Sequence, residues 1–156
     1  MIRVETSATI DRAVEDVARY VGDIERMTEW TDMTASRRLT DGPTRDGTKA
    51  YAEVAMGPVK LGWTYQIQDV DPNGGFAFKT ITRNALGMDG SVRLTPTAPD
   101  KTKVDYTVQI QTRGLLRILE PLLRGEMAGN EARELVRLKA QLEADPAATA
   151  ASATPA

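Results

Sequence analysis

The sequence predicts a single α+β domain in which a curved antiparallel sheet wraps around a long C-terminal helix. Three observations support this fold class: one short strand followed by two short helices, alternating strands from about Met33 to Thr112, and an apolar-striped helix from Leu115 to about Glu143. A single long helix after an antiparallel sheet can bury its stripe across the concave face of that sheet. Because a curved sheet around a helix commonly leaves space between them, this order favours an internal pocket.

The N-terminal segment predicts one strand and two short helices. Apolar or small residues alternate with polar ones over residues 2–8, which is the pattern of a half-buried strand. Asp11 fits the N-cap of a helix that ends at Gly22, and Asp23 fits the cap of a second short helix that carries Trp30.

Two-residue periodicity then predicts six more strands, and therefore a sheet of seven. The strands alternate between an apolar and a polar face, which indicates antiparallel pairing, since buried parallel strands are apolar throughout. The residues predicted to share the inward faces are Met33, Ala35, Arg37, Leu39, Thr48, Ala50, Ala52, Val54, Met56, Leu61, Trp63, Tyr65, Ile67, Phe76, Phe78, Thr80, Val92, Leu94, Val104, Tyr106, Val108 and Ile110.

The predicted C-terminal helix contains residues that weaken it. Pro121 either kinks the helix or separates a turn over residues 115–120 from a helix that starts at Pro121. Gly125 and Gly129 lower the helix propensity of its middle, each by about 0.5–1 kcal/mol relative to Ala. Two interpretations remain open: a bent helix that follows the curved sheet, or a helix made thin where a ligand needs room.

Composition limits the chemistry that this chain can perform. The 156 residues contain no His and no Cys, which excludes a Ser-His-Asp triad, a thiol nucleophile and zinc sites built on either residue. Glycine-rich nucleotide-binding motifs are absent too, so we expect no cofactor and no metal. The available acid and base groups are Asp, Glu, Lys and Tyr.

Charge and hydropathy indicate a cytoplasmic protein that binds neither nucleic acid nor a membrane. The formal net charge is −2, with acidic and basic residues interspersed, so no basic field attracts nucleic acid. No stretch reaches the about 20 apolar residues of a membrane span, and the N-terminus lacks the character of a signal peptide. We expect a monomer or homodimer with one domain over residues 1–144 and a disordered Ala/Pro/Thr tail over 145–156.

Five segments of the chain are characteristic of one superfamily: Asp11-Arg12-Ala13-Val14-Glu15-Asp16-Val17, Asp23-Ile24-Glu25-Arg26-Met27-Thr28-Glu29-Trp30, Gly47-Thr48, Leu119-Glu120-Pro121-Leu122-Leu123 and Leu135-Val136-Arg137-Leu138-Lys139. Through these segments, residues 2–143 resemble the helix-grip superfamily, which includes birch-pollen-allergen-like proteins, START lipid-transfer domains and bacterial polyketide cyclase/dehydrase-like proteins. The resemblance is greatest to the bacterial cyclase and lipid-transport branch. It implies a ligand cavity between the sheet and the C-terminal helix, but that branch holds both enzymes and carriers.

Alternation also predicts which side chains form the cavity wall. Aromatic residues on one sheet face suit a small-molecule pocket because they offer rigid apolar area, and Tyr adds a hydroxyl. The alternative for each of them is packed core without a void. The predicted ligand-binding residues are Trp63, Tyr65, Phe78, Tyr106 and Val108 from the sheet, with Leu119, Leu123 and Met127 from the helix.

Arg37 shares the parity of its apolar neighbours, which would point it inward, where a buried Arg needs a carboxylate or an anionic ligand. Asp69 could be that partner or could begin a turn, and Glu53 is expected to be solvated. A register shift would instead leave Arg37 in water. Trp30 is either a packing anchor or a lip of the entrance, and Met33 and Met56 either line the pocket or fill gaps.

Three functions are compatible with these residues. The first is binding or transport of a small hydrophobic ligand such as a lipid or polyketide-like molecule. The second is a cyclase or aromatase, with Tyr65, Tyr106 and Arg37 as the candidate proton-transfer groups. The third is a non-catalytic interaction scaffold with a filled core. Binding needs only an apolar cavity, a polar anchor and an entrance, whereas catalysis also needs placed acid and base groups. No acid–carboxylate pair is visible from the spacing, so the sequence favours ligand binding or transport.

Overall fold

Seven antiparallel strands form one sheet in the computed structural model, which describes residues 1–82 and 85–144. The order of the strands across the sheet is β1-β7-β6-β5-β4-β3-β2. The predicted tail over residues 145–156 lies outside the described residues. The strands are β1 (Ile2–Ile10), β2 (Met33–Arg38), β3 (Lys49–Met56), β4 (Val59–Gln68), β5 (Phe76–Thr80), β6 (Leu86–Ala98) and β7 (Lys101–Thr112).

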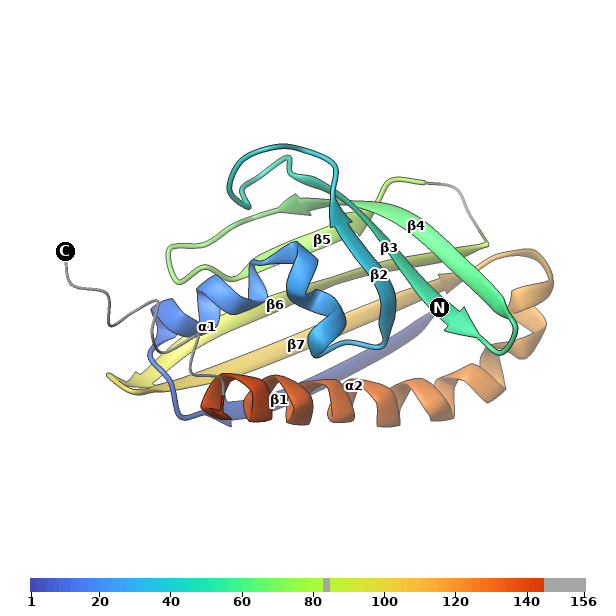
Figure 1. The fold of residues 1–156 in the computed structure, drawn as a ribbon. Coiled ribbons are helices and arrows are strands. Elements are labelled where there is room, and N and C mark those ends of the chain that lie inside the picture. Colours follow the sequence, from blue (N-terminus) through green and yellow to red (C-terminus); the bar gives the residue numbers. More distant parts are fainter. Residues whose placement is uncertain (83–84, 145–156) are drawn as a thin grey trace.

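The first and last strands are neighbours in this sheet. β1 pairs with β7 from Ile2 opposite Ile110 to Ile10 opposite Thr102, and every other pair joins strands that follow one another along the chain. The sheet is strongly curled, with β2, β3 and β4 bent over toward the helices (Figure 1). The predicted seven-stranded antiparallel sheet is thereby confirmed.

The helical elements lie on the concave side of this sheet. α1 and η1 cover its middle, and α2 runs along β1 (Figure 1). The α+β architecture predicted from the element order, a curved sheet around a long C-terminal helix, is confirmed. The elements are α1 (Val14–Val21), the 3₁₀ helix η1 (Ile24–Glu29), the 3₁₀ helix η2 (Gly114–Leu119) and α2 (Glu120–Ala144).

The N-cap prediction for α1 is wrong. Ala13 occupies the cap position, and its side chain makes no cap hydrogen bond. The backbone amide of Asp11 instead donates to Glu143 Oε1 at 3.0 Å, and Arg12 Nη2 donates to the Glu143 carbonyl at 2.8 Å. These bonds hold the end of α2 against the connection between β1 and α1. Gly22 ends α1 as predicted.

The inward faces of the central strands form the core, as the alternation predicts. Burying these side chains stabilises the fold by about 25 cal/mol for each Å² of apolar surface removed from water. The second half of α2 packs on the same core through Leu135, Leu138 and Leu142. Fully buried strand residues include Ile10, Ala50, Ala52, Ile67, Val104, Val108 and Ile110.

A β-bulge in β2 reverses the orientation predicted for Arg37. The register with β3 shifts between Met33 and Ala35, so that later residues face the opposite way from simple alternation. Ser36 now faces inward, where its hydroxyl donates to the Ile24 carbonyl at 2.6 Å. Arg37 is exposed on the outer face.

The C-terminal helix is shorter than predicted because η2 precedes it. Gly114, with φ of 62°, begins η2, and Pro121 lies in the first turn of α2, where its missing amide proton costs nothing. The separated-turn alternative is therefore the observed one. η2 and the first turn of α2 leave three apolar side chains in solvent: Leu115, Ile118 and Leu122 are 84%, 74% and 73% exposed.

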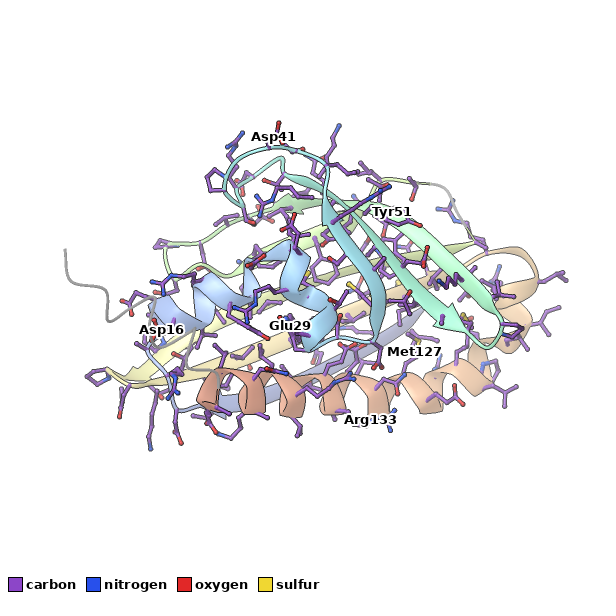
Figure 2. The ribbon with its side chains drawn as sticks, viewed as in Figure 1. Asp16, Glu29, Asp41, Tyr51, Met127 and Arg133 are labelled. Atoms are coloured by element: carbon purple, nitrogen blue, oxygen red, sulfur yellow. The ribbon has the colours of Figure 1, made fainter. Side chains whose placement is uncertain are left out.

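The hypothesis that glycines thin the helix for a ligand stays a prediction. Gly125 and Gly129 are both exposed, and an added Cβ at Gly125 would meet open space. Figure 2 shows Met127 on the sheet-facing side of α2 and Arg133 on the opposite side. No helix over residues 1–82 and 85–144 is long and apolar enough to cross a membrane.

Candidate ligand-binding site

The predicted aromatic side chains surround a pocket that they almost fill. Its remaining volume is about 20 Å³, which is room for roughly one water molecule. The packed-core alternative therefore describes this part of the interior well. We name it the aromatic pocket, and its lining residues are Met27, Trp30, Thr31, Met33, Trp63, Tyr65, Phe76, Phe78, Val92 and Tyr106.

Edge-to-face contacts explain why the aromatic pocket is so full. The rings of Trp30 and Tyr106 have centroids 5.9 Å apart at 67°, and those of Tyr65 and Phe78 are 6.0 Å apart at 65°. Gly90 lies opposite Phe78 in the sheet, and a Cβ there would approach the Phe78 ring to 2.6 Å. Glycine is therefore required at this position for the ring to lie against β6.

A second and larger space lies between α2, the β3–β4 hairpin and the start of β6. Its volume is about 460 Å³, within the range of about 300–1,000 Å³ typical of small-molecule sites. We name it the carboxyl cavity because glutamates form part of its wall. Its lining residues are Asp32, Val54, Ala55, Met56, Gly57, Leu86, Met88, Leu123, Glu126, Met127, Asn130, Glu131 and Glu134.

The eight predicted ligand-binding residues are divided between these two spaces. Four of them, Trp63, Tyr65, Phe78 and Tyr106, line the aromatic pocket, while Leu123 and Met127 line the carboxyl cavity. Val108 is fully buried but lines neither space. Leu119 ends η2, is 43% exposed and also lies outside both.

The remaining candidates from the sequence are Trp30, Met33, Met56 and Asp69. Trp30 is 2% exposed and packs on Tyr106, as a packing anchor does. Met33 lines the aromatic pocket and Met56 the carboxyl cavity. Asp69 is exposed, with φ of 52°, in the turn after β4, and cannot pair with Arg37 inside the fold.

Arg37 cannot act in either space. Its guanidinium lies over the Tyr51 ring on the outer face of the sheet, 5.0 Å from the ring centroid. The Tyr51 hydroxyl donates to Glu53 Oε2 at 3.1 Å, so Glu53 is partly buried and hydrogen-bonded rather than simply solvated. The bulge in β2 causes this placement, and Arg37 is no longer a candidate for proton transfer to a ligand in the interior.

Two glutamates that the sequence reasoning missed form the polar wall of the carboxyl cavity. Glu131 and Glu134, one turn apart on α2, are only 4% and 6% exposed. The backbone amide of Asp32 donates to Glu134 Oε1 at 2.8 Å. The Oε2 atoms of both glutamates are buried without a hydrogen-bond partner.

Burial makes this pair hold protons more strongly than ordinary glutamates do. Loss of hydration raises the pKa of Glu131, and the neighbouring Glu134 raises it further. Loss of hydration also raises the pKa of Glu134, although the Asp32 amide opposes that rise. Because the two carboxyls interact, they titrate as a pair.

Tyr106 joins the two spaces. Its ring lines the aromatic pocket, and its hydroxyl is close enough to Glu131 and Glu134 to sense their charge. Burial raises the pKa of the Tyr106 hydroxyl well above its usual value, and the two carboxyls raise it further. Tyr106 therefore remains a neutral hydrogen-bonding group beside the two glutamates.

A signal for the two glutamates was present in the sequence. Counting by four from Leu123 gives Met127, Glu131 and Leu135, so Glu131 falls in the apolar stripe of the helix. Glu134 lies three residues after Glu131 and shares that face. Charged residues within an apolar stripe that packs on a sheet indicate buried carboxyls.

The fold is that of a helix-grip domain, with a space between its sheet and α2. The sequence model of the family described as "Polyketide cyclase / dehydrase and lipid transport" matches residues 1–143. The chain belongs to this family, and the resemblance noted from its motifs is confirmed. No curated protein sequence matches the chain significantly.

Solved structures with the same fold include both enzymes and lipid-transfer proteins. The Zhui aromatase/cyclase from Streptomyces sp. R1128 has a TM-score of 0.75 at 17% identity, over 90% of this chain and 93% of that one. A START superfamily protein from Mycobacterium smegmatis has a TM-score of 0.73 at 14% identity, over 90% of this chain and 97% of that one. A STAR-related lipid transfer protein from Xanthomonas axonopodis has a TM-score of 0.68 at 17% identity, over 89% of this chain and 84% of that one. At these identities the likeness shows the fold alone.

Proposed function

We propose that the protein binds and carries a small, mostly hydrophobic molecule in the carboxyl cavity. The observation that carries this proposal is the volume of about 460 Å³ between the sheet and α2. Apolar side chains make up much of its wall and would remove an apolar ligand from water: Val54, Met56, Leu86, Met88, Leu123 and Met127. A family described by both polyketide cyclisation and lipid transport supports a ligand of this kind.

The cavity also counts against the scaffold alternative. A protein that only presents a surface gains nothing from an unfilled interior, because each missing contact lowers its stability. The carboxyl cavity stays open between the sheet and α2, although the aromatic pocket is nearly filled. Such a local departure from close packing favours a space that a ligand occupies.

A cyclase or aromatase is the second candidate, and one observation favours it. Glu131 and Glu134 line the cavity and interact with the Tyr106 hydroxyl, and carboxyls with a raised pKa can both donate and accept protons near neutral pH. A flexible polyketide-like chain held there would have proton-transfer groups beside it. This candidate uses Tyr106 from the sequence hypothesis and replaces Arg37 with the glutamates.

Native mass spectrometry of the purified protein tests the binding proposal directly. We expect a species heavier than the polypeptide by the mass of one small molecule, and Met127→Trp should remove it by filling the cavity. Val136→Trp is the matched control, since Val136 lies on the opposite side of α2 and is 67% exposed. Loss of the ligand from both variants would contradict the proposed location.

Ligand titration covers the case in which purification strips the ligand. Binding of aliphatic alcohols, amines, fatty acids or flavonoids, measured by calorimetry, should be weakened at least tenfold by Met127→Trp and unchanged by Val136→Trp. If the wild-type protein neither co-purifies with a ligand nor binds any of these compounds, the proposal is wrong. Conversion of a bound polyketide-like aromatic precursor, abolished by Glu131→Gln, would establish the cyclase instead.

A further inference from the structure

The charged residues of the carboxyl cavity all carry the same sign. Asp32, Glu126, Glu131 and Glu134 contribute to its wall, and among the described residues that line it none is Lys or Arg. An anionic headgroup such as a carboxylate or phosphate would find no opposite charge among these side chains, and each of them that is ionised would repel it. The wall therefore selects against fatty acids and phospholipids.

The nearest arginine is already engaged. Arg137 lies one turn after Glu134 on α2, and its Nη2 donates to Asp32 Oδ1 at 2.6 Å. Arg137 lowers the pKa of Glu134 only as a minor influence, well behind the effect of burial. Glu131 and Glu134 thus have no cationic partner of their own that could balance the charge of the pair.

Each of the two glutamates has one carboxyl oxygen that is buried without a hydrogen-bond partner. Their Oε2 atoms make no hydrogen bond, although the side chains are more than nine-tenths buried and line the cavity. A buried polar atom without a partner is costly, and more so when it is charged. A group that supplies several donors and a positive charge would relieve this cost for both side chains at once.

We propose that the carboxyl cavity takes a hydrophobic amine, with its ammonium nitrogen held between Glu131 and Glu134 and its apolar body against the methionine and leucine side chains of the wall. This inference rests on the proposed binding function and names the class of ligand. A primary ammonium group offers three donors. Carboxyl groups of both glutamates, which line the cavity, and the Tyr106 hydroxyl, which interacts with both of them, can accept these donors.

The experiment compares three ten-carbon probes that differ only in their polar group. Binding of n-decylamine, n-decanol and n-decanoate to the full chain is measured by isothermal titration calorimetry at neutral pH, below the micelle concentrations of the amine and the carboxylate and below the aqueous solubility of the alcohol. We expect n-decylamine to bind at least tenfold more tightly than n-decanol, and n-decanoate to bind most weakly. This order follows from the acidic wall, since the apolar bodies are the same.

The variant Glu131→Gln/Glu134→Gln keeps the shape of the wall and removes its charge. It should lose at least tenfold in affinity for n-decylamine and keep its affinity for n-decanol. The control Glu5→Gln/Glu15→Gln makes the same change in net charge at two exposed positions and should bind like the wild type. Binding of the alcohol by the first variant also shows that the variant is folded.

Proton release gives a second readout that a purely structural role would not change. The groups around the pair are Tyr106 from β7, Asp32 from the η1–β2 connection and Arg137 on α2. An ammonium group favours the charged carboxylates, so amine binding should expel protons that the pair holds. The measured heat should therefore differ between phosphate and Tris buffers for the wild type and not for the glutamine variant.

The outcomes separate this inference from the proposed function. If n-decanol or n-decanoate binds as tightly as n-decylamine, or if the glutamine variant binds the amine like the wild type, the amine inference is wrong and the binding function stands. If none of the three probes binds and no ligand co-purifies, the proposed function fails as well.

Discussion

Glu131 and Glu134 occupy positions on α2 that the packing of the helix assigns to the interior. Leu135 and Leu138 on the same face are 2% and 0% exposed, and the two glutamates are almost as deeply buried. A buried carboxyl lowers stability when it is charged, because its hydration is lost and no cation replaces it. Their retention at such positions is understandable where the carboxyls contact a ligand.

At the residue scale, the carboxyl pair predicts that stability falls as pH rises. The native state holds protons that the unfolded chain releases above about pH 4.3, so the free energy of unfolding should decrease between about pH 5 and about pH 8. Each unit by which the native pKa exceeds the unfolded value corresponds to about 1.4 kcal/mol. Urea denaturation at several pH values measures this decrease.

The glutamine variant supplies the comparison for this pH effect. Glu131→Gln/Glu134→Gln should flatten the pH dependence and be more stable than the wild type at about pH 8. The chain has no His, so no imidazole titration overlaps this pH range. Glu5→Gln/Glu15→Gln should retain the wild-type dependence. Equal slopes for the wild type and the buried-pair variant would show that the pair is already ionised in the native state.

At the element scale, α2 consists of two halves with different tasks. Its second half packs on the sheet through Leu135, Leu138 and Leu142 and is held at Glu143 by Asp11 and Arg12. Its first half forms one wall of the carboxyl cavity through Leu123 and Met127, and its first turn leaves Leu122 exposed. The apolar stripe thus changes from a core contact to a cavity wall along one helix.

This division predicts unequal costs for the same substitution. Leu138→Ala should lower the free energy of unfolding by about 2–5 kcal/mol, because Leu138 is fully buried. Leu122→Ala should change it by less than about 0.5 kcal/mol, since Leu122 is 73% exposed. Denaturation of both variants under the same conditions measures the difference. A large loss from Leu122→Ala would mean that the first turn of α2 is covered in solution.

At the scale of the whole molecule, the sheet and α2 close the fold together. β1 is the edge strand that pairs with β7, and α2 packs along it, so the first strand and the last helix of the described chain lie side by side (Figure 1). A curled sheet that closes in this way leaves one long space on its concave side. α1, η1 and the aromatic rings fill one part of that space, and the carboxyl cavity is the rest.

This closure predicts where the chain can be shortened. Truncation after Ala144 should leave the melting temperature and ligand binding unchanged, because β1 to α2 lie within residues 1–144. This is the domain boundary that we propose. Truncation after Glu134 removes Leu135, Leu138 and Leu142 and should abolish cooperative unfolding. Circular dichroism melts of the two truncated chains test the boundary. A clear loss of stability in the chain that ends at Ala144 would mean that the domain extends beyond that residue.

Much of the fold was predictable from local patterns. Alternation along β4 and β7 placed Trp63, Tyr65 and Tyr106 on the buried face, because each strand there is regular and side chains in it alternate strictly. The same rule failed at Arg37, where one bulge in β2 reversed the face. A bulge depends on pairing with a neighbouring strand, which a single segment does not reveal.

The sequence by itself determined the class of the fold, the exclusion of histidine and cysteine chemistry, and the presence of aromatic side chains in the interior. Tertiary structure decided where the empty space lies. Edge-to-face contacts let the aromatic rings fill their own pocket, which left the carboxyl cavity beneath the first half of α2. It also decided that Glu131 and Glu134 are buried without a cation, because burial and charge pairing depend on residues far apart in the chain.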